Sequence, residues 1–152
     1  MKVYDVVADL RGQRFAALLT ELGRHADTIG FVVQGEMAAE TRELLDTIDS
    51  LKISDGLRQS WPGTRLLDGF ARVLEYPASP SVLEALAHVA DGVFDWSRPS
   101  FPEDVFMTSG ATVLLETVGH ERFAVVRCQD ISPLLQSLVD DGILRPRRQR
   151  LT

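Results

Sequence analysis

PEDVFMTSGATVLLETVGHERFAVVRC, residues Pro102 to Cys128, carries the densest β-strand signal in this chain of 152 residues. Three runs rich in β-branched and apolar residues are separated by two short polar turns, in the order 105–108, Ser109-Gly110, 111–118, 119–122 and 123–128. The pattern predicts a meander of three antiparallel strands. Such a meander is stable only when its apolar face is covered, so we expect a layer of helices on it.

Apolar residues at helical spacing predict four helices around the meander. The second pair begins at Ser-Pro steps, which suit an N-cap followed by the first helical residue. The expected helices are Val3–Arg24, Met37–Ile48, Ser79–Ala90 and Leu134–Asp140.

Two further strand regions are expected before the meander. Thr28–Gln34 is a short β-rich run, and Asp68-Gly69 between apolar flanks favours a hairpin whose second arm ends at Tyr76. A helix over 66–74 is the competing interpretation of this hairpin. Residues 49–63 are predicted to be irregular. The sequence therefore predicts the α+β class: an antiparallel sheet of about five strands with helices packed on it in a single pair of layers. Ile143-Leu144 is a candidate for one more short pairing.

The composition predicts a single domain over residues 1–144, followed by a basic tail over 145–152. The chain is 45% hydrophobic and 25% charged, which is typical of a globular protein. No apolar run approaches the roughly 20 residues that a membrane span needs, and the first residues do not resemble a signal peptide. We therefore expect a cytoplasmic protein without a membrane partner.

The charge is unevenly distributed along the chain. The formal net charge is -6, but the last eight residues hold four arginines and no acid, which leaves 12 basic and 22 acidic residues before them. An acidic body disfavours nucleic acid and suits a basic protein partner. The tail reads either as a solvated end or as a nucleic-acid-binding segment through Arg145, Arg147, Arg148 and Arg150.

Familiar catalytic and cofactor motifs are not found in the sequence. It has no phosphate-binding glycine loop, no HExxH and no GxSxG. Three scattered histidines and one cysteine do not form a zinc-binding pattern, so we expect neither a metal nor a cofactor. Cys128 ends an apolar run, which favours a buried hydrophobic role over a catalytic thiolate.

One polar group offers a weak catalytic hypothesis. His120 and Glu121 occupy the second turn of the meander, Glu116 lies on the strand before it, and Asp104 lies at the start of the first strand. The beginning of the first strand and the second turn can lie at the same end of a meander. A histidine with carboxylates there could act in general acid–base chemistry, and the alternative is a set of polar turn residues.

The meander also resembles a family. Pro102-Glu103-Asp104-Val105-Phe106, Leu114-Leu115-Glu116-Thr117, His120-Glu121 and Ala124 follow a pattern found in small actinobacterial proteins of similar length that have no assigned activity. The resemblance covers residues 102–124. It implies a strand-and-turn shape and a bacterial origin, and it carries over no mechanism.

A binding role is the main functional hypothesis. Glu36, Glu40, Glu43 and Asp46 are expected on one side of the second helix, and Trp61 is either an edge residue of the core or an exposed contact. These features suggest a non-catalytic protein-binding module, of the immunity or regulatory type, with an acidic face for a basic partner. The alternatives are a small enzyme using the His120 group, and a structural subunit or homodimer paired along a sheet edge.

Overall fold

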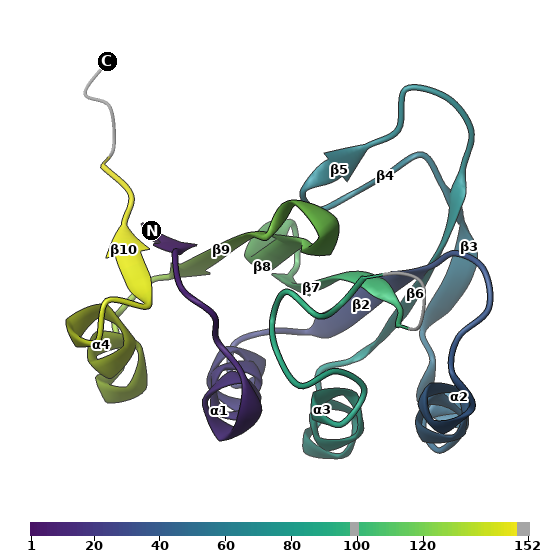
Figure 1. Ribbon diagram of the computed structural model, residues 1–152, viewed down its shortest axis with the longest axis horizontal. Coiled ribbons are helices and arrows are strands. Elements are labelled where there is room, and N and C mark those ends of the chain that lie inside the picture. Colours follow the sequence, from purple (N-terminus) through teal and green to yellow (C-terminus); the bar gives the residue numbers. More distant parts are fainter. Residues whose placement is uncertain (98–100, 149–152) are drawn as a thin grey trace.

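The computed structural model describes residues 1–97 and 101–148, and shows a sheet with helices on one of its faces (Figure 1). Within these residues the elements follow one another as β1 (Lys2–Val6), α1 (Gly12–Gly23), β2 (Thr28–Val33), α2 (Ala39–Asp46), η1 (Asp49–Leu51), β3 (Ser54–Arg58), β4 (Ser60–Trp61), β5 (Thr64–Arg65), β6 (Ala71–Pro77), α3 (Pro80–Ala87), β7 (Glu103–Ser109), β8 (Thr112–Val118), η2 (Gly119–Glu121), β9 (Phe123–Cys128), α4 (Pro133–Asp140) and β10 (Leu144–Pro146).

The main sheet has eight strands in the order β10-β1-β9-β8-β7-β2-β6-β3, and all its pairings are antiparallel. The expected antiparallel sheet with a helix layer is confirmed, but the expected number of about five strands was wrong. The three-strand meander is present as β7, β8 and β9. A β-bulge between β7 and β8 shifts the register at Leu114, so that the simple alternation expected along β8 is interrupted there.

The main hydrophobic core lies between the sheet and the helices. All four helices, α1 to α4, lie on the same side of the sheet (Figure 1). Helix α1 buries the stripe that its sequence spacing predicts, namely Phe15, Leu18, Leu19 and Leu22. Trp96 is fully buried in the same core and packs against Phe31, whose ring lies 5.8 Å away, centroid to centroid. Within the described residues, no helix combines the length and apolar character that crossing a membrane requires.

The other face of the sheet carries a small second core beneath the β4–β5 hairpin. It contains Val32, Trp61, Ala71, Val73 and Phe106. The Phe106 ring lies directly over Gly30 of the neighbouring strand β2, where a Cβ atom would come within 2.4 Å of the ring. A glycine is therefore required at this position by the close approach of a side chain.

The prediction of one long helix over Val3–Arg24 was wrong for its first residues. Residues 2–6 form strand β1 between β9 and β10, and the helix begins at Gly12. Tyr4 and Val6 are buried while their neighbours are not, which is the two-residue period of a strand. The apolar positions of this short stretch fit both periods, and pairing with two neighbouring strands decides between them.

The hairpin expected at Asp68-Gly69 was also wrong. Strand β5 pairs with β4 across a turn at Pro62-Gly63, and β6 pairs with β2 and β3 instead. The second arm of the expected hairpin is still a strand, so the competing helical interpretation of 66–74 is not supported. Strand β3 was missed because Ser54-Asp55-Gly56 has the composition of a turn.

The last strand of the sheet extends past residue 144. Strand β10 pairs with β1, and the Arg147 N–H donates to the Val3 carbonyl at 2.8 Å. The Arg147 guanidinium also donates to the Asp5 carboxylate, with Nε 3.0 Å from Oδ1. Arg145 and Arg147 thus belong to the sheet and its edge. Of the predicted tail over 145–152, residues 149–152 lie outside the described part of the chain.

Candidate functional site

The second turn of the meander exposes its histidine. Residues 119–121 form the short helix η2, and Arg122 closes the turn in the left-handed conformation. His120 and Glu121 point into solvent, with side chains 63% and 65% exposed, and their nearest charged atoms are 3.8 Å apart. Glu116, on β8, forms an ion pair with Arg127 on the neighbouring strand at 3.2 Å. None of these three side chains lines either of the cavities found in the described residues.

The expected proximity of the first strand and the second turn is confirmed. The Gly119 N–H donates to Asp104 Oδ1 at 3.0 Å, so Asp104 lies at the base of the turn. Its other carboxylate oxygen, Oδ2, accepts the indole N–H of Trp61 at 3.1 Å. Asp104 is only 3% exposed. Both of its oxygens are therefore engaged in holding the hairpin and the turn to the sheet.

Burial dominates the electrostatics of Asp104. Burial raises the pKa of this carboxyl above its usual value, and the hydrogen bonds from Gly119 and Trp61 only partly oppose this effect. His120 adds a smaller stabilisation of the charged form. The four candidates therefore separate into a buried structural carboxyl, a carboxylate in an ion pair and two exposed turn residues.

Trp61 is a core residue. Its side chain is 7% exposed and lies in the small core beneath the β4–β5 hairpin. Of the two roles considered for it, the structure shows the buried one, and Trp61 does not offer a surface to a partner. The indole N–H that such a buried residue must satisfy is donated to Asp104.

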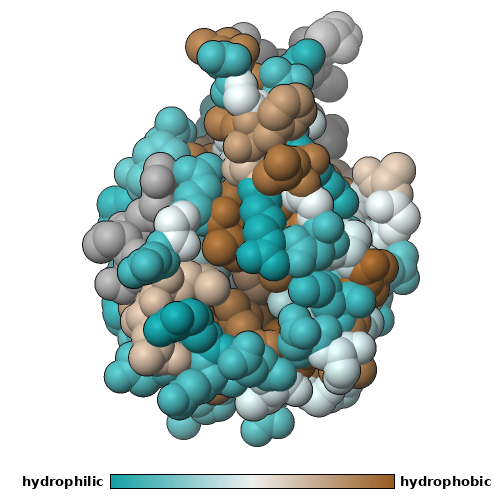
Figure 2. All heavy atoms as spheres, turned by 90° about the vertical axis from the view of Figure 1, so that its right-hand side faces the viewer, coloured by the Kyte–Doolittle hydropathy of each residue, from teal (hydrophilic) through white to brown (hydrophobic). Residues whose placement is uncertain are grey.

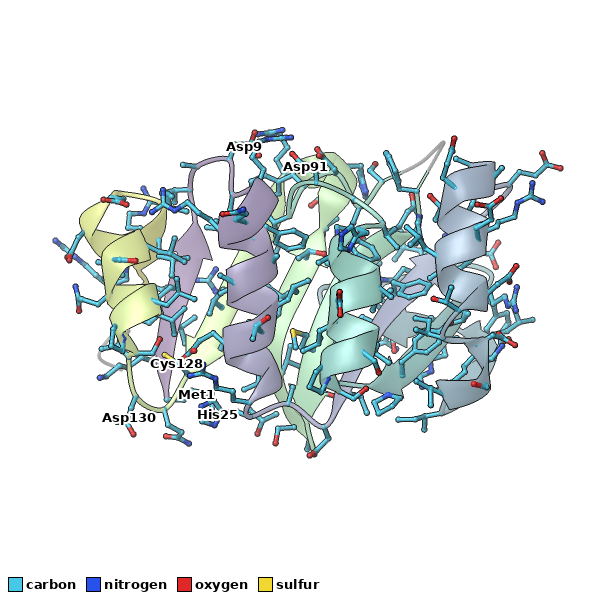
Figure 3. The ribbon with its side chains drawn as sticks, turned by 90° about the horizontal axis from the view of Figure 1, so that it is seen from below. Met1, Asp9, His25, Asp91, Cys128 and Asp130 are labelled. Atoms are coloured by element: carbon cyan, nitrogen blue, oxygen red, sulfur yellow. The ribbon has the colours of Figure 1, made fainter. Side chains whose placement is uncertain are left out.

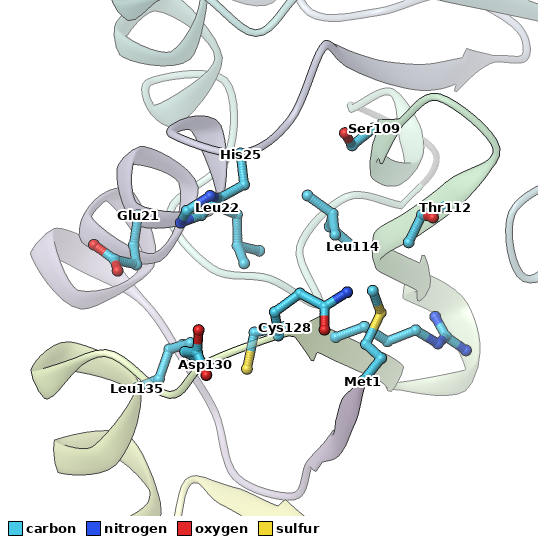
Figure 4. A pocket seen from close by; sticks show the side chains of 12 residues that line it. Met1, Glu21, Leu22, His25, Ser109, Thr112, Leu114, Cys128, Asp130 and Leu135 are labelled. Atoms are coloured by element: carbon cyan, nitrogen blue, oxygen red, sulfur yellow. The ribbon is translucent and has the colours of Figure 1, made fainter.

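A cavity that sequence reasoning missed opens between α1, α4 and one end of the sheet. It has a volume of about 320 Å³ and an apolar floor that includes Leu22, Leu114 and Leu135 (Figure 4). The sulfur of Cys128 lies at this cavity, on the same side as Asp130 (Figures 3 and 4). Its lining comes from four separate segments, at Met1, 21–25, 109–114 and 127–135, so that no local motif could have indicated it. The polar residues that line it include Glu21, His25 and Asp130.

The chemistry of this cavity does not favour a thiolate nucleophile. Burial raises the pKa of the Cys128 thiol, and the nearby Asp130 carboxylate raises it further, while Lys2 acts in the opposite direction. Glu21 is held by Arg24 at 3.1 Å. In the described residues, no three His, Cys, Asp or Glu side chains are grouped so that they could hold a metal ion. The cavity is at the small end of the range for ligand pockets.

The acidic side chains expected on the second helix are exposed. Glu36 precedes α2, and Glu40, Glu43 and Asp46 lie on it, while Thr41 and Leu45 are buried against the molecule. We call Glu36, Glu40, Glu43 and Asp46 the acidic face. Helix α2 lies beneath β6 and β3, at the end of the sheet where β3 has no neighbour beyond it (Figure 1).

Most of the large apolar side chains that are exposed in the described chain come from the segment that follows α2. Five of the seven come from the short segment between residues 51 and 70, namely Leu51, Ile53, Leu57, Leu67 and Phe70. We call these five residues the apolar edge. Figure 2 shows apolar side chains running through this side of the molecule with hydrophilic ones around them. Contiguous exposed apolar surface with a polar border is typical of protein-binding sites.

Comparisons with protein-family models, curated proteins and solved structures found no match. The resemblance of residues 102–124 to small actinobacterial proteins therefore stays a prediction.

Proposed function

We propose that this protein is a non-catalytic protein-binding module, of the immunity or regulatory type, that acts in the cytoplasm and presents its acidic face to a basic partner. The observation that carries the proposal is the exposed acidic face on α2, which lies beneath the open edge of the sheet, where Ile53 and Leu57 are also exposed. Charged groups at the border of an apolar patch steer a partner of opposite charge and fix its orientation. The apolar side chains supply the area that is buried on binding.

The arrangement of the other candidate residues supports a binding role over an enzymatic one. Asp104 is engaged by Trp61 and Gly119, and Glu116 is paired with Arg127. His120 lies beside the exposed Glu121, at a distance too long for a hydrogen bond. An acid–base mechanism needs groups that converge on a bound substrate, and these do not.

A capture experiment with three forms of the full chain tests the proposal. The tagged protein, the variant Glu40→Lys/Glu43→Lys/Asp46→Lys, and the control Glu84→Lys/Glu121→Lys/Asp130→Lys are incubated with the source lysate at moderate salt and analysed by mass spectrometry. Both triple variants change the net charge equally, and all six side chains are exposed. The control therefore separates a local site from a general effect of charge.

We expect a stoichiometric basic protein with the natural chain and with the control, released as salt rises, and lost with the acidic-face variant. Binding measured with the purified partner should then be tight for the natural chain and the control, and weak for the acidic-face variant. Retention of that partner by the acidic-face variant, at unchanged affinity, would contradict the proposal.

A further inference from the structure

We propose that the partner binds by adding an extended basic segment to the free edge of β3, as a ninth strand of the main sheet. This inference rests on the proposed function and names the mode of binding and the chemistry of the segment. Addition of a strand to a sheet edge is a recurring form of peptide recognition, in which backbone hydrogen bonds provide affinity and alternate side chains provide specificity.

The two edges of the main sheet differ in their protection. Strand β10 is three residues long, ends in Pro146, which has no N–H, and has Arg145 within it and Arg147 just after it. Short length, proline and positive charge are the features that block pairing at an edge. Strand β3 is five residues long and contains no proline. Of the two edges, β3 is therefore the one that can accept a further strand.

The direction of the backbone groups along β3 can be assigned. The Ile53 N–H donates to the Glu75 carbonyl of β6 at 2.7 Å. The Glu75 carbonyl therefore faces β3, and its partner in the register is Ser54, so Ser54, Gly56 and Arg58 are the residues whose backbone groups face β6. The N–H and C=O groups of Asp55 and Leu57 then point away from the sheet, where no described strand pairs with them.

The side chains on one face of β3 suit an apolar neighbour. Ile53 and Leu57 are 57% and 72% exposed, and alternation places them on the same face as Asp55. Asp55 lies opposite Leu74, a residue of the main core, so this is the face on which the helices lie. Phe70, which is 67% exposed, immediately precedes β6.

Charge decides between a basic segment and a second copy of this chain. A second copy that paired along β3 would continue the same sheet, and it would bring its own α2 beside the α2 of the first copy. The exposed Glu40, Glu43 and Asp46 of the two copies would then be brought together, with Arg42 as the only basic residue of each α2. A segment with Lys or Arg side chains on its helix-facing side would instead pair with these carboxylates. The proposed segment therefore combines apolar and basic residues.

Synthetic peptides test the mode of binding directly. The probe is a fluorescein-labelled peptide in which every second residue is threonine and the residues between them are valine and lysine in turn, so that one face carries both apolar and basic side chains. Its binding to the full chain is measured by fluorescence anisotropy. Two further versions carry N-methyl groups on every second amide, in one frame or in the other. An added strand uses the amides of one frame only. We expect one frame to lose affinity by about tenfold or more, since several backbone hydrogen bonds are removed, and the other frame to bind as the parent does.

Equal loss in both frames, or loss in neither, would overturn strand addition. A parent peptide that does not bind at all, or a concentration-dependent dimer of the protein that the Leu57→Lys change disrupts, would overturn it as well. The same assay with Ile53→Lys/Leu57→Lys should show strongly reduced binding, and a thermal melt should confirm that this variant is folded. Both side chains are exposed, so the substitutions do not disturb the core.

The lysate experiment separates this inference from the proposed function. Loss of the captured partner with the acidic-face variant, together with retention by Ile53→Lys/Leu57→Lys, would leave the proposed function standing and remove the strand addition. Retention by both variants would contradict both. Loss with both variants, and retention by the charge-matched control, is the result that supports both.

Discussion

The indole of Trp61 donates a hydrogen bond to the carboxylate of Asp104 across 3.1 Å, and both side chains are almost completely buried. This contact joins the β4–β5 hairpin to the beginning of β7, 43 residues later in the chain. The second oxygen of Asp104 accepts the Gly119 N–H, so one carboxylate holds together a hairpin, a strand and a turn. It explains why the small second core forms on the face of the sheet that has no helices.

Replacing Trp61 by phenylalanine tests the hydrogen bond with most of the ring retained. The change leaves a buried carboxylate oxygen without its donor, which costs about 1–3 kcal/mol. We expect the free energy of unfolding to fall by that amount in urea denaturation. Trp61→Ala should cost more, because it also empties the core beneath the hairpin. A phenylalanine variant as stable as the natural chain would contradict the assignment.

Asp104 should also make stability depend on pH in an unusual direction. Burial is the largest effect on this carboxyl and raises its pKa above the usual 3.8. Between 3.8 and the raised value the folded protein binds more protons than the unfolded chain, so stability contributed by this group falls as pH rises through that window. Asp104→Asn should remove this contribution.

Urea denaturation at a series of pH values measures the effect. The difference in free energy of unfolding between the natural chain and Asp104→Asn should change across the window, and should be constant above it. Asp130→Asn, which changes an exposed carboxylate, serves as the control. A difference that does not vary with pH would show that Asp104 has an ordinary pKa in the folded state.

Gly30→Ala should destabilise the sheet. A Cβ at this position would lie 2.4 Å from the Phe106 ring and 2.8 Å from the Leu74 carbonyl oxygen, which is backbone and cannot turn aside. Overpacking of this kind costs about 1–3 kcal/mol, measurable by thermal or urea denaturation. Gly56→Ala is the control, because a Cβ there has no atom within 4 Å. If the two variants proved equally stable, the close packing of Phe106 on Gly30 would be refuted.

The meander could be predicted because its information is local. Phe123–Cys128 is a strand with the bounds that its residues indicate. The turn before β8 is at Gly110-Ala111, one residue later than predicted, because Ser109 still pairs with Thr112. The strands β1 and β3 could not be predicted in the same way. Lys2–Val6 is a strand because it pairs with strands more than 100 residues away in the chain. Ser54–Arg58 is a strand because it pairs with β6.

The candidate site shows the same division between local and distant information. Adjacency of Asp104 and the turn at 119–122 follows from meander topology, and it is confirmed. The burial of Asp104 depends on Trp61, which reaches it from a hairpin whose position no local pattern indicates. The exposure of the acidic face could be expected from helical spacing. The exposure of the apolar edge could not be expected, because the same apolar residue types occur at sheet edges and in the core.

The two Ser-Pro helix starts, which look alike in the sequence, should respond differently to mutation. The Ser132 hydroxyl accepts the Leu135 N–H at 3.2 Å at the beginning of α4, whereas Ser79 makes no side-chain cap to α3. Loss of such a cap costs about 1 kcal/mol, so Ser132→Ala should lower the free energy of unfolding by that amount. Ser79→Ala should change it little. Equal effects of the two substitutions would mean that the cap at Ser132 is not formed.

Cys128 should react slowly with alkylating reagents in the folded protein. Burial raises the pKa of its thiol, and the thiolate is the reactive form, so the fraction available near neutral pH is smaller than for a free thiol. Iodoacetamide labelling followed by mass spectrometry should be slower than labelling of glutathione, and should speed up in denaturing urea. Leu114→Ala, which removes a side chain from the wall of the cavity beside Cys128, should increase the rate in the folded protein by improving access. Labelling as fast as that of glutathione would mean that the thiol is accessible and ionised, which would restore this cavity as a candidate for thiol chemistry.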